Sequence, residues 1–325
     1  LEFRRVLFRS LFGIGTFSQV NGISSAVNNF FDPKNQHTVK VLPFLGEYSW
    51  SVVIASLVLA FCVAAVLIGG VKRIASVSQI IVPFMAVIYI VFVLVLVVCN
   101  ITAVPAAFAT IVKAAFSPRA ITGGAVGSFL VAMQKGVARG IFSNEAGLGS
   151  APIAAAAAQT KEPVRQGLVS MTGTFIDTIV ICTLTGLSIV LTGAWQVDGL
   201  EGVQVTTYAF QNGLPLPKEL SAFVLMLCLV FFAFTTILGW DYYSERCLEY
   251  LSGGRMKYVK VYRWIYILAV FIGPYMTVSA VWTIADIFNG LMALPNMIAL
   301  FALSDVVVKE TRHFFERHRN GEIED

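Results

Sequence analysis

The stretch Gly140-Ile-Phe-Ser-Asn-Glu-Ala-Gly-Leu-Gly-Ser150 interrupts a segment that is otherwise apolar and long enough to cross a membrane. It contains three glycines, two serines, an asparagine and a glutamate. Backbone that unwinds in contact with lipid leaves N–H and C=O groups unpaired at a cost of several kcal/mol each, so the interruption must face protein or a polar cavity. Helices broken at mid-membrane form the substrate and ion sites of secondary transporters. The stretch therefore favours a membrane transporter.

The composition of the whole chain points to the same class. The chain has 325 residues, of which 57% are hydrophobic and only 13% charged, whereas about 25% of the residues of a soluble domain are charged. Apolar runs of about 20 residues, the length that crosses a bilayer, recur along it. We expect an all-α polytopic membrane protein in contact with membrane lipid. The net charge of +4 does not indicate a nucleic-acid partner, because the basic residues lie in short loops.

The apolar runs predict eight membrane elements with loops of unequal charge. The elements are expected at roughly residues 11–30, 50–70, 77–99, 128–159 (interrupted), 167–193, 220–243, 262–281 and 284–308. If the loops alternate between the two sides, one side holds thirteen Lys and Arg residues and the other holds five. Basic loops stay in the cytoplasm. The sequence therefore predicts a multi-pass protein of the plasma (inner) membrane with a cytoplasmic C-terminus.

The chain divides into one transport domain with short ends. Residues 1–10 lack an initiator Met and are interpreted as a truncation scar. Residues 11–308 form the transmembrane transporter domain, broken at 141–149, and residues 309–325 form a charged cytoplasmic tail. The connections at residues 31–49, 100–127 and 194–219 are expected on the outer side, the second of them as a surface or re-entrant helix.

The broken element is the first candidate site. The carbonyls that end its first half and the N–H groups that begin its second half would lack helical partners, giving a negative and a positive pole at mid-membrane. Such poles suit a zwitterion, and we place Phe142, Ser143, Asn144 and Gly147 at the substrate. The alternative is a re-entrant loop or a kink with no ligand.

Ionisable residues within predicted spans are costly and are the next candidates. Glu145 lies in the break, and Lys135 and Arg139 precede it on one helix face. Arg139 either pairs with Glu145 or serves gating or coupling. Asp177 would hold a cation or a proton, or would pair with a basic residue.

Two further groups carry polar side chains into apolar spans. Thr235 and Thr236 offer hydroxyl oxygens to a small cation, although such hydroxyls also commonly bond to the preceding helical turn. Trp240 would wall a pocket or anchor the helix at the interface. Gln19 would meet a ligand or make an interhelical hydrogen bond.

Enzymatic chemistry is not indicated. The five cysteines show no CxxC spacing, and the three histidines lie in a loop or the tail. No nucleophile with a base and no metal cluster is visible. A channel would need a continuous polar stripe along several spans, whereas the polar residues here concentrate in a few patches.

Four stretches together resemble the alanine or glycine:cation symporter family, that is, the sodium:alanine symporters. They are GIFSNEAGLGSAPIAAAAAQTKEPV (140–164), RQGLVSMTGTFIDTIVICTLTGL (165–187), FTTILGWDYYSERC (234–247) and DIFNGLMALPNMIAL (286–300). The resemblance covers residues 11 to about 311. It implies a leucine-transporter-like inverted-repeat fold of two five-helix repeats. It also implies sodium-coupled symport of a small neutral amino acid, alanine or glycine, into the cell by alternating access.

The resemblance also assigns roles to residues. It implies that Gln19, residues 142–147 and Trp240 line the substrate site and that Thr235 and Thr236 match a sodium site, with Na+ as coupling ion and no cofactor. The family's glycine-rich first broken helix is not found, so the fold is expected to lack its first two core helices. This chain alone is then not expected to transport. A proton-coupled carrier of the same fold, or one with another amino acid or cation, is the alternative, and the oligomeric state is left open.

Overall fold

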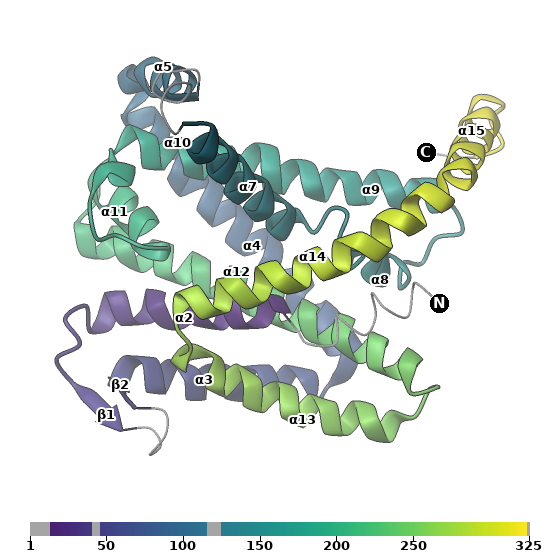
Figure 1. Cartoon of the computed structure of the whole chain (residues 1–325), viewed down its shortest axis with the longest axis horizontal. Helices are drawn as coiled ribbons and strands as arrows, with labels where there is room; N and C mark the ends of the chain where they lie inside the picture. Colours follow the sequence, from purple (N-terminus) through teal and green to yellow (C-terminus); the bar gives the residue numbers. More distant parts are fainter. Residues whose placement is uncertain (1–13, 41–45, 116–124, 324–325) are drawn as a thin grey trace.

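The structure, a computed structural model, describes residues 14–40, 46–115 and 125–323. The predicted scar at residues 1–10 lies outside these ranges. Most of the described residues are helical, and the long helices run side by side along the longest axis of the molecule (Figure 1). The prediction of a mainly helical protein is confirmed, with the correction that a small antiparallel hairpin is also present.

Five helices among the described residues are long and apolar enough to cross a membrane, which confirms a polytopic membrane protein. They are α3 (Trp50–Leu67), α4 (Gly70–Cys99), the continuous unit α9 (Pro163–Phe175), η2 (Ile176–Cys182) and α10 (Thr183–Leu191), α12 (Lys218–Leu251), and α14 (Val278–Ala302). Three further elements accompany them: α2 (Ile14–Phe31), α13 (Met256–Ile272), and the pair α7 (Ala125–Asn144) and α8 (Ala151–Ala155).

The remaining elements lie in connections or in the tail. The hairpin strands β1 (Thr38–Lys40) and β2 (Glu47–Ser49) pair Val39 with Tyr48. The other elements are the short helices η1 (Ile101–Ala103), α5 (Val104–Ala115), η3 (Ala194–Gln196), α11 (Val203–Gly213) and η4 (Gly273–Tyr275), and the longer α15 (Ser304–Arg319). The expected loop at 194–219 therefore contains a helix.

Two predicted spans have the wrong boundaries near the C-terminus. The element expected at 262–281 ends at Ile272, because Gly273-Pro274 follows and Pro lacks the N–H that would continue the helix. Helix α14 then starts anew, with the Thr277 hydroxyl accepting a hydrogen bond from the N–H of Ala280. The expected span 284–308 is divided at Leu303, after which the charged helix α15 begins.

Helix α12 is the central element of the bundle. It contacts α2 most extensively, and also α4, α11 and α13. One apolar cluster joins α12 to α2, α3 and α13 through buried residues that include Val20, Val63, Ile237 and Val270. A second cluster joins it to α4 and α11 and includes Phe210. The helix runs to Leu251, two turns beyond the expected end, and stays buried on one face as far as Cys247.

The contact between α2 and α12 depends on a glycine. A Cβ atom built on Gly15 would lie 1.9 Å from Nε1 of Trp240, so only glycine allows the indole to rest there. One residue further along α2, the Thr16 hydroxyl lies 2.5 Å from the Tyr266 hydroxyl of α13. Small residues that let helices approach closely are a principal source of association in membranes, where lipid is as apolar as a leucine side chain.

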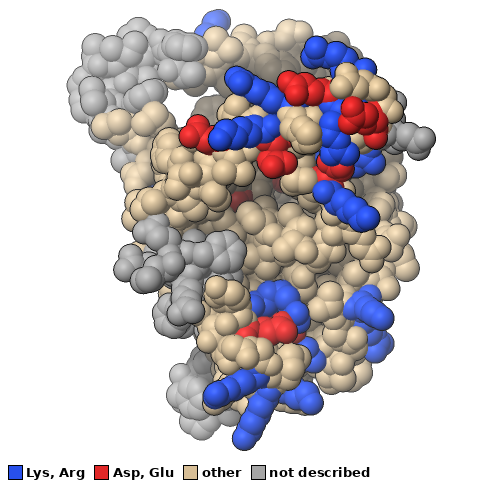
Figure 2. Space-filling view, turned by 90° about the vertical axis from the view of Figure 1, so that its right-hand side faces the viewer, with Lys and Arg blue, Asp and Glu red and all other residues tan. Residues whose placement is uncertain are grey.

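Charged side chains gather at the end of the molecule where α15 lies. Figure 2 views the molecule from the end at which α15 and the turn between α12 and α13 lie, and Lys and Arg side chains gather over it. Several are paired with carboxylates there, including Arg317 with Glu162 at 3.1 Å and Arg246 with Glu249. This end corresponds to the side predicted to be cytoplasmic.

The first testable prediction concerns Gly15. Gly15→Ala should lower the free energy of unfolding of the purified protein by about 1–3 kcal/mol, because the added methyl group displaces the Trp240 indole. Gly22→Ala in the same helix is the matched control, since its Cβ would only reach ordinary contact, 3.8 Å from Leu229. That control should be neutral or stabilising by about 0.5–1 kcal/mol. Equal effects of the two substitutions would contradict the contact.

The second prediction concerns Asp32, in the connection after α2. The Ser49 hydroxyl donates to its carboxylate at 2.6 Å and the N–H of Gln36 at 2.9 Å, and these bonds lower the pKa of Asp32 below its ordinary value. The stabilisation is therefore present above the ordinary pKa and is lost as the pH falls toward the lowered one. Unfolding midpoints measured from neutral to acid pH should decline less steeply in Asp32→Asn, and Ser49→Ala should show part of that change. An unchanged acid decline in Asp32→Asn would contradict this role.

Candidate functional site

The interruption of the transmembrane helix lies between Asn144 and Ala151. Three residues in it have positive φ: Glu145 at 55°, Gly147 at 84° and Gly149 at 84°. Glycine adopts this conformation freely, whereas Glu145 does so at a cost. The following helix, α8, has only five residues and ends at Ala155, short of the expected residue 159. The negative pole at the end of the long helix α7 is therefore better developed than the positive pole opposite it.

Two polar residues before the break face the neighbouring span. The Ser143 hydroxyl lies 2.9 Å and 2.7 Å from the two carboxylate oxygens of Asp177, and the Asn144 amide donates to the Thr178 hydroxyl at 3.0 Å. Both partners lie in η2, a π-helical turn of the kind often found at functional sites. Asp177 thus accepts from a hydroxyl here, and no basic partner is found for it among the described residues.

A pocket of about 320 Å³ opens beside the break, and we call it the central pocket. It is lined by Ser78, Val82, Met85, Glu145, Thr235, Thr236, Gly239, Trp240 and Tyr243. Helices α4 and α12 and the unwound segment thus contribute to one cavity. Of the predicted site residues, the pocket brings together Glu145, Thr235, Thr236 and Trp240.

The two threonines of the central pocket are oriented by the backbone. The Thr235 hydroxyl donates to the carbonyl of Phe232 at 3.0 Å, and the Thr236 hydroxyl donates to the same carbonyl at 2.9 Å. This is the bond to the preceding turn that the sequence left open as an alternative. A hydroxyl that donates its proton keeps its lone pairs, so both oxygens can still accept from a ligand or coordinate a cation.

Trp240 lies inside the bundle. Its side chain is 3% exposed and packs with Leu148 of the break and with Ala285 and Met292 of α14. On its other side it meets Gly15. It therefore belongs to the pocket wall, in contrast to the membrane-interface anchor considered from the sequence.

Arg139 pairs with a residue that the sequence did not single out. Its Nη2 donates to the two carboxylate oxygens of Asp286 at 3.0 Å and 2.8 Å, and its guanidinium lies 3.9 Å from the centre of the Trp282 ring. The alternative pairing of Arg139 with Glu145 is therefore wrong. The Trp282 ring also packs edge-on against Phe142. This cluster joins α7 to α14 just before the break.

A second cavity of about 530 Å³, mostly apolar in its lining, adjoins this ion pair. Its lining includes Lys135, Asp286 and Asn289, together with Leu148, which also contacts Trp240. The Asn289 Oδ1 atom is buried there without a hydrogen-bond partner. Leu148 lines this cavity and Trp240 lines the central pocket, and the two side chains pack together in one apolar cluster.

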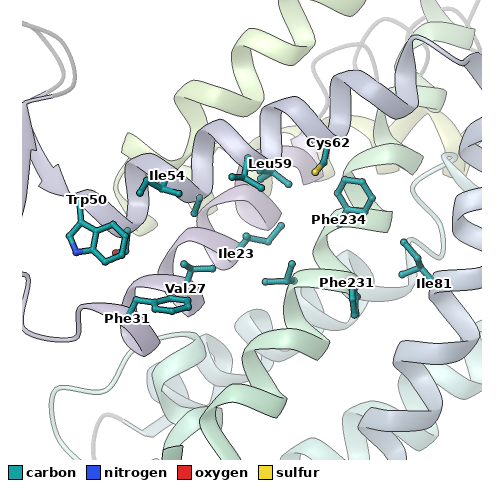
Figure 3. A pocket seen from close by; sticks show the side chains of 14 residues that line it. Ile23, Val27, Phe31, Trp50, Ile54, Leu59, Cys62, Ile81, Phe231 and Phe234 are labelled. Carbon is teal, nitrogen blue, oxygen red and sulfur yellow. The ribbon is translucent and has the colours of Figure 1, made fainter. Parts of the chain in front are cut away.

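An apolar pocket of about 480 Å³ lies between α2, α3 and α12 (Figure 3). Its wall consists of hydrocarbon and aromatic side chains such as Val27, Ile54 and Phe231, with Ser51 and Cys62 as its polar members. Such a lining does not suit a zwitterion or an ion, so this pocket is not a candidate transport site.

Other predicted residues lie elsewhere, and some lining residues were not foreseen. Gln19 is half-buried in α2 and is not part of the central pocket. The Gly147 carbonyl accepts from the Asn296 amide at 3.0 Å. Ser78 was missed because one serine at the start of a long span carries no pattern. Asp286 stood in a motif already quoted, and being ionisable inside a span was the signal that could have identified it.

In the described ranges, no group of three or more His, Cys, Asp or Glu residues is placed to hold a metal ion. The central pocket offers hydroxyl oxygens and one carboxylate instead. Hard cations prefer such oxygen ligands.

Comparison with known proteins gives the family. The family model described as the sodium:alanine symporter family matches residues 3–325. The chain is 51% identical over 309 residues to an uncharacterized transporter of Haemophilus influenzae, a match that covers 95% of this chain and 63% of that protein. It is 45% identical over 314 residues to the sodium/alanine symporter AgcS of Methanococcus maripaludis, with 95% and 63% covered.

A third relative is the amino-acid carrier protein AlsT of Bacillus subtilis, 37% identical over 276 residues, with 85% of this chain and 57% of that protein covered. The chain thus spans less than two thirds of the length of these relatives. The matched length and the identities are decisive for the family. This chain belongs to the sodium:alanine symporter family, whose members are secondary transporters and not enzymes.

Proposed function

We propose that this chain is the greater part of a sodium-coupled carrier that brings a small neutral amino acid, alanine or glycine, into the cell by alternating access. The observation that carries the proposal is the central pocket, in which Thr235, Thr236 and Glu145 meet beside an unwound helix. The proposed fold is the leucine-transporter-like inverted repeat, and the proposed location is the plasma membrane with the C-terminus in the cytoplasm.

Sodium is favoured as the coupling ion by the donor set of the pocket. The hydroxyls of Ser78, Thr235 and Thr236 and the carboxylate of Glu145 are all oxygen ligands, and the single carboxylate balances one positive charge. Because both threonine hydroxyls donate to the backbone, their lone pairs are the part left for a cation. A bound cation would hold α12, α4 and the unwound segment together.

The amino acid is proposed to lie against the end of α7. Carbonyl groups at that end suit an ammonium group, and Trp240 with Leu148 limits the room for a side chain. The Methanococcus maripaludis relative is named for sodium and alanine, which agrees with a small substrate. Phe142, Ser143, Asn144 and Gly147 remain proposed substrate residues, and Gln19 is proposed to reach the substrate only in another conformation.

The Arg139 and Asp286 pair is proposed as a gate. It links the last turns of α7 to α14 over the wall formed by Leu148 and Trp240, and about one third of each side chain is exposed. Opening this pair would separate α7 from α14. Asp177, which holds Ser143, is proposed to position the end of α7 rather than to bind the ion.

A proton-coupled carrier is the second candidate. It is favoured by the position of Glu145, a carboxyl group in the central pocket that could exchange a proton instead of accompanying a sodium ion. The two candidates differ in what the threonine hydroxyls do, because a proton needs only Glu145 whereas sodium needs several oxygens.

The third testable prediction separates these candidates by uptake of labelled alanine and glycine into transport-deficient cells. The chain alone and the chain preceded by the N-terminal segment of the Methanococcus maripaludis relative are compared, and activity is expected only in the extended form. Thr235→Ala with Thr236→Ala should then reduce sodium-dependent uptake about tenfold or more, the equivalent of about 1.4 kcal/mol or more in sodium binding.

The matched control for this experiment is Thr207→Ala in α11. The Thr207 hydroxyl also donates to the preceding turn, to Val203 at 3.0 Å, but it lies outside the central pocket. Its removal should leave uptake unchanged. Uptake that persists without sodium and without the two hydroxyls would contradict the sodium site and favour the proton-coupled candidate.

The fourth prediction concerns the gate. Arg139→Gln and Asp286→Asn should each slow uptake and destabilise the protein by about 1–2 kcal/mol, because each leaves a charge without its partner in a half-buried site. The double variant should lose less stability than the sum of the losses in the two single variants. The pair Arg317 and Glu162, of similar exposure, is the control, and its neutralisation should not change uptake. If the losses of stability and of uptake in the two single variants add up exactly in the double variant, Arg139 and Asp286 do not act as a pair, and the gate is contradicted.

A further inference from the structure

Asp241 is a buried carboxyl group that the proposed transport mechanism does not use. It follows Trp240 in α12, but at 3.6 residues per turn it projects from roughly the opposite face to the one that lines the central pocket. Its side chain is 0% exposed, and neither carboxyl oxygen has a hydrogen-bond partner. Since both oxygens are already enclosed, a further segment of a longer protein could not reach them without rearrangement.

The cation that acts on Asp241, Arg263, is bound to another carboxylate. Arg263 of α13 donates from Nε and Nη2 to the two oxygens of Glu245 at 2.6 Å and 2.9 Å. Glu245 lies one turn after Asp241 on the same face of α12 and is 1% exposed. Asp241 therefore meets a like charge on its own helix and a guanidinium whose two donors facing Glu245 are already used.

The other titratable groups that interact with Asp241 are tyrosines of α13, Tyr262 and Tyr266. Tyr266 donates to the carbonyl of Ile237 at 2.7 Å and lies 2.5 Å from the Thr16 hydroxyl, so its proton is not directed at Asp241. Helix α2, which packs on the same region, brings no titratable side chain among its described residues. Among the described residues, Arg263 is thus the cation that attracts a negative charge on Asp241, and no group donates a hydrogen bond to its carboxyl oxygens.

An ionised carboxylate in such a place would cost far more than the margin by which proteins are stable. We propose that Asp241 is a proton-binding site, separate from the central pocket, that is protonated in this conformation. The proton leaves to water when Arg263 shifts by one turn from Glu245 toward Asp241. Asp241 and Glu245 then share the Arg263 guanidinium. The site gains one negative charge in this step, which equals the one proton released to water. Proton release is thus tied to the contact between α12 and α13.

The fifth prediction tests this site without any transport assay, so its failure is distinct from a failure of the proposed function. Infrared spectra of the purified protein should contain a C=O band of the protonated Asp241 carboxyl group, identified as the component that shifts in D2O and is missing from the Asp241→Asn spectrum. A band from Glu145, the carboxyl group of the proton-coupled candidate, would be present in both spectra. Asp286→Asn is the matched control and should keep the band, because Asp286 already has a guanidinium partner. Absence of the band from the unaltered protein, or its survival in Asp241→Asn, would overturn the proposal.

The exchange of Arg263 is tested by Glu245→Gln. This substitution frees the guanidinium, which should then serve as the counter-ion of Asp241, so the band should disappear although Asp241 is still present. A band that persists in Glu245→Gln would overturn the exchange.

The pH dependence of stability gives a second readout. A carboxyl group that is protonated when folded and ionised when unfolded takes up one proton on folding, so stability falls as the pH rises. Relative to Asp241→Asn, which resembles the protonated acid in shape, the unfolding equilibrium constant of the unaltered protein should rise about tenfold per pH unit above the range in which free carboxyl groups titrate. Equal pH dependence of the two proteins would overturn the proposal.

Discussion

The unwound backbone between α7 and α8 is the feature on which the rest of the structure depends, because hydrocarbon cannot satisfy its N–H and C=O groups. Its second part, from Leu148 to Ser150, is buried, and the neighbouring elements hold the more exposed first part by hydrogen bonds. Leu148 is buried against Trp240, the Gly147 carbonyl accepts from Asn296, and Ser143 and Asn144 are held by the π-helical turn of the next span. A polar segment held in this way can become a site, since Glu145 of the segment lines the central pocket.

Helix α12 connects this segment to the rest of the bundle. One face of it carries the two threonines and Trp240 to the central pocket, and the opposite face carries Asp241 and Glu245 to α13. The position of Trp240 depends in turn on Gly15 of α2. A shift of α12 would therefore act on the pocket, on the contact with α2 and on the Arg263 pair at the same time. Such a shared element is what a carrier needs if ion binding is to change access to its substrate.

Much of this could be predicted from the sequence. Composition and run length indicated a polytopic helical membrane protein, and the polar residues of 140–150 indicated where the helix is broken, because both follow from the chemistry of lipid and backbone. Helix ends near Gly273-Pro274 and Leu303 were misplaced, since hydropathy averages over such short breaks. The partners of ionisable residues were the least predictable part. Arg139 meets Asp286 across 147 positions of sequence, and only the packing of α7 on α14 brings them together.

The most direct test of the account is whether the central pocket binds sodium. Trp240 lines that pocket together with Thr235 and Thr236, so its fluorescence reports on a cation bound there. Titration of the purified, extended protein with sodium should give a saturable change in tryptophan fluorescence. The change should be absent with choline at equal ionic strength, in Trp240→Phe, and when both threonines are replaced by alanine. An identical response to choline, or a sodium response that survives without the two hydroxyls, would contradict the assignment of this pocket as the cation site.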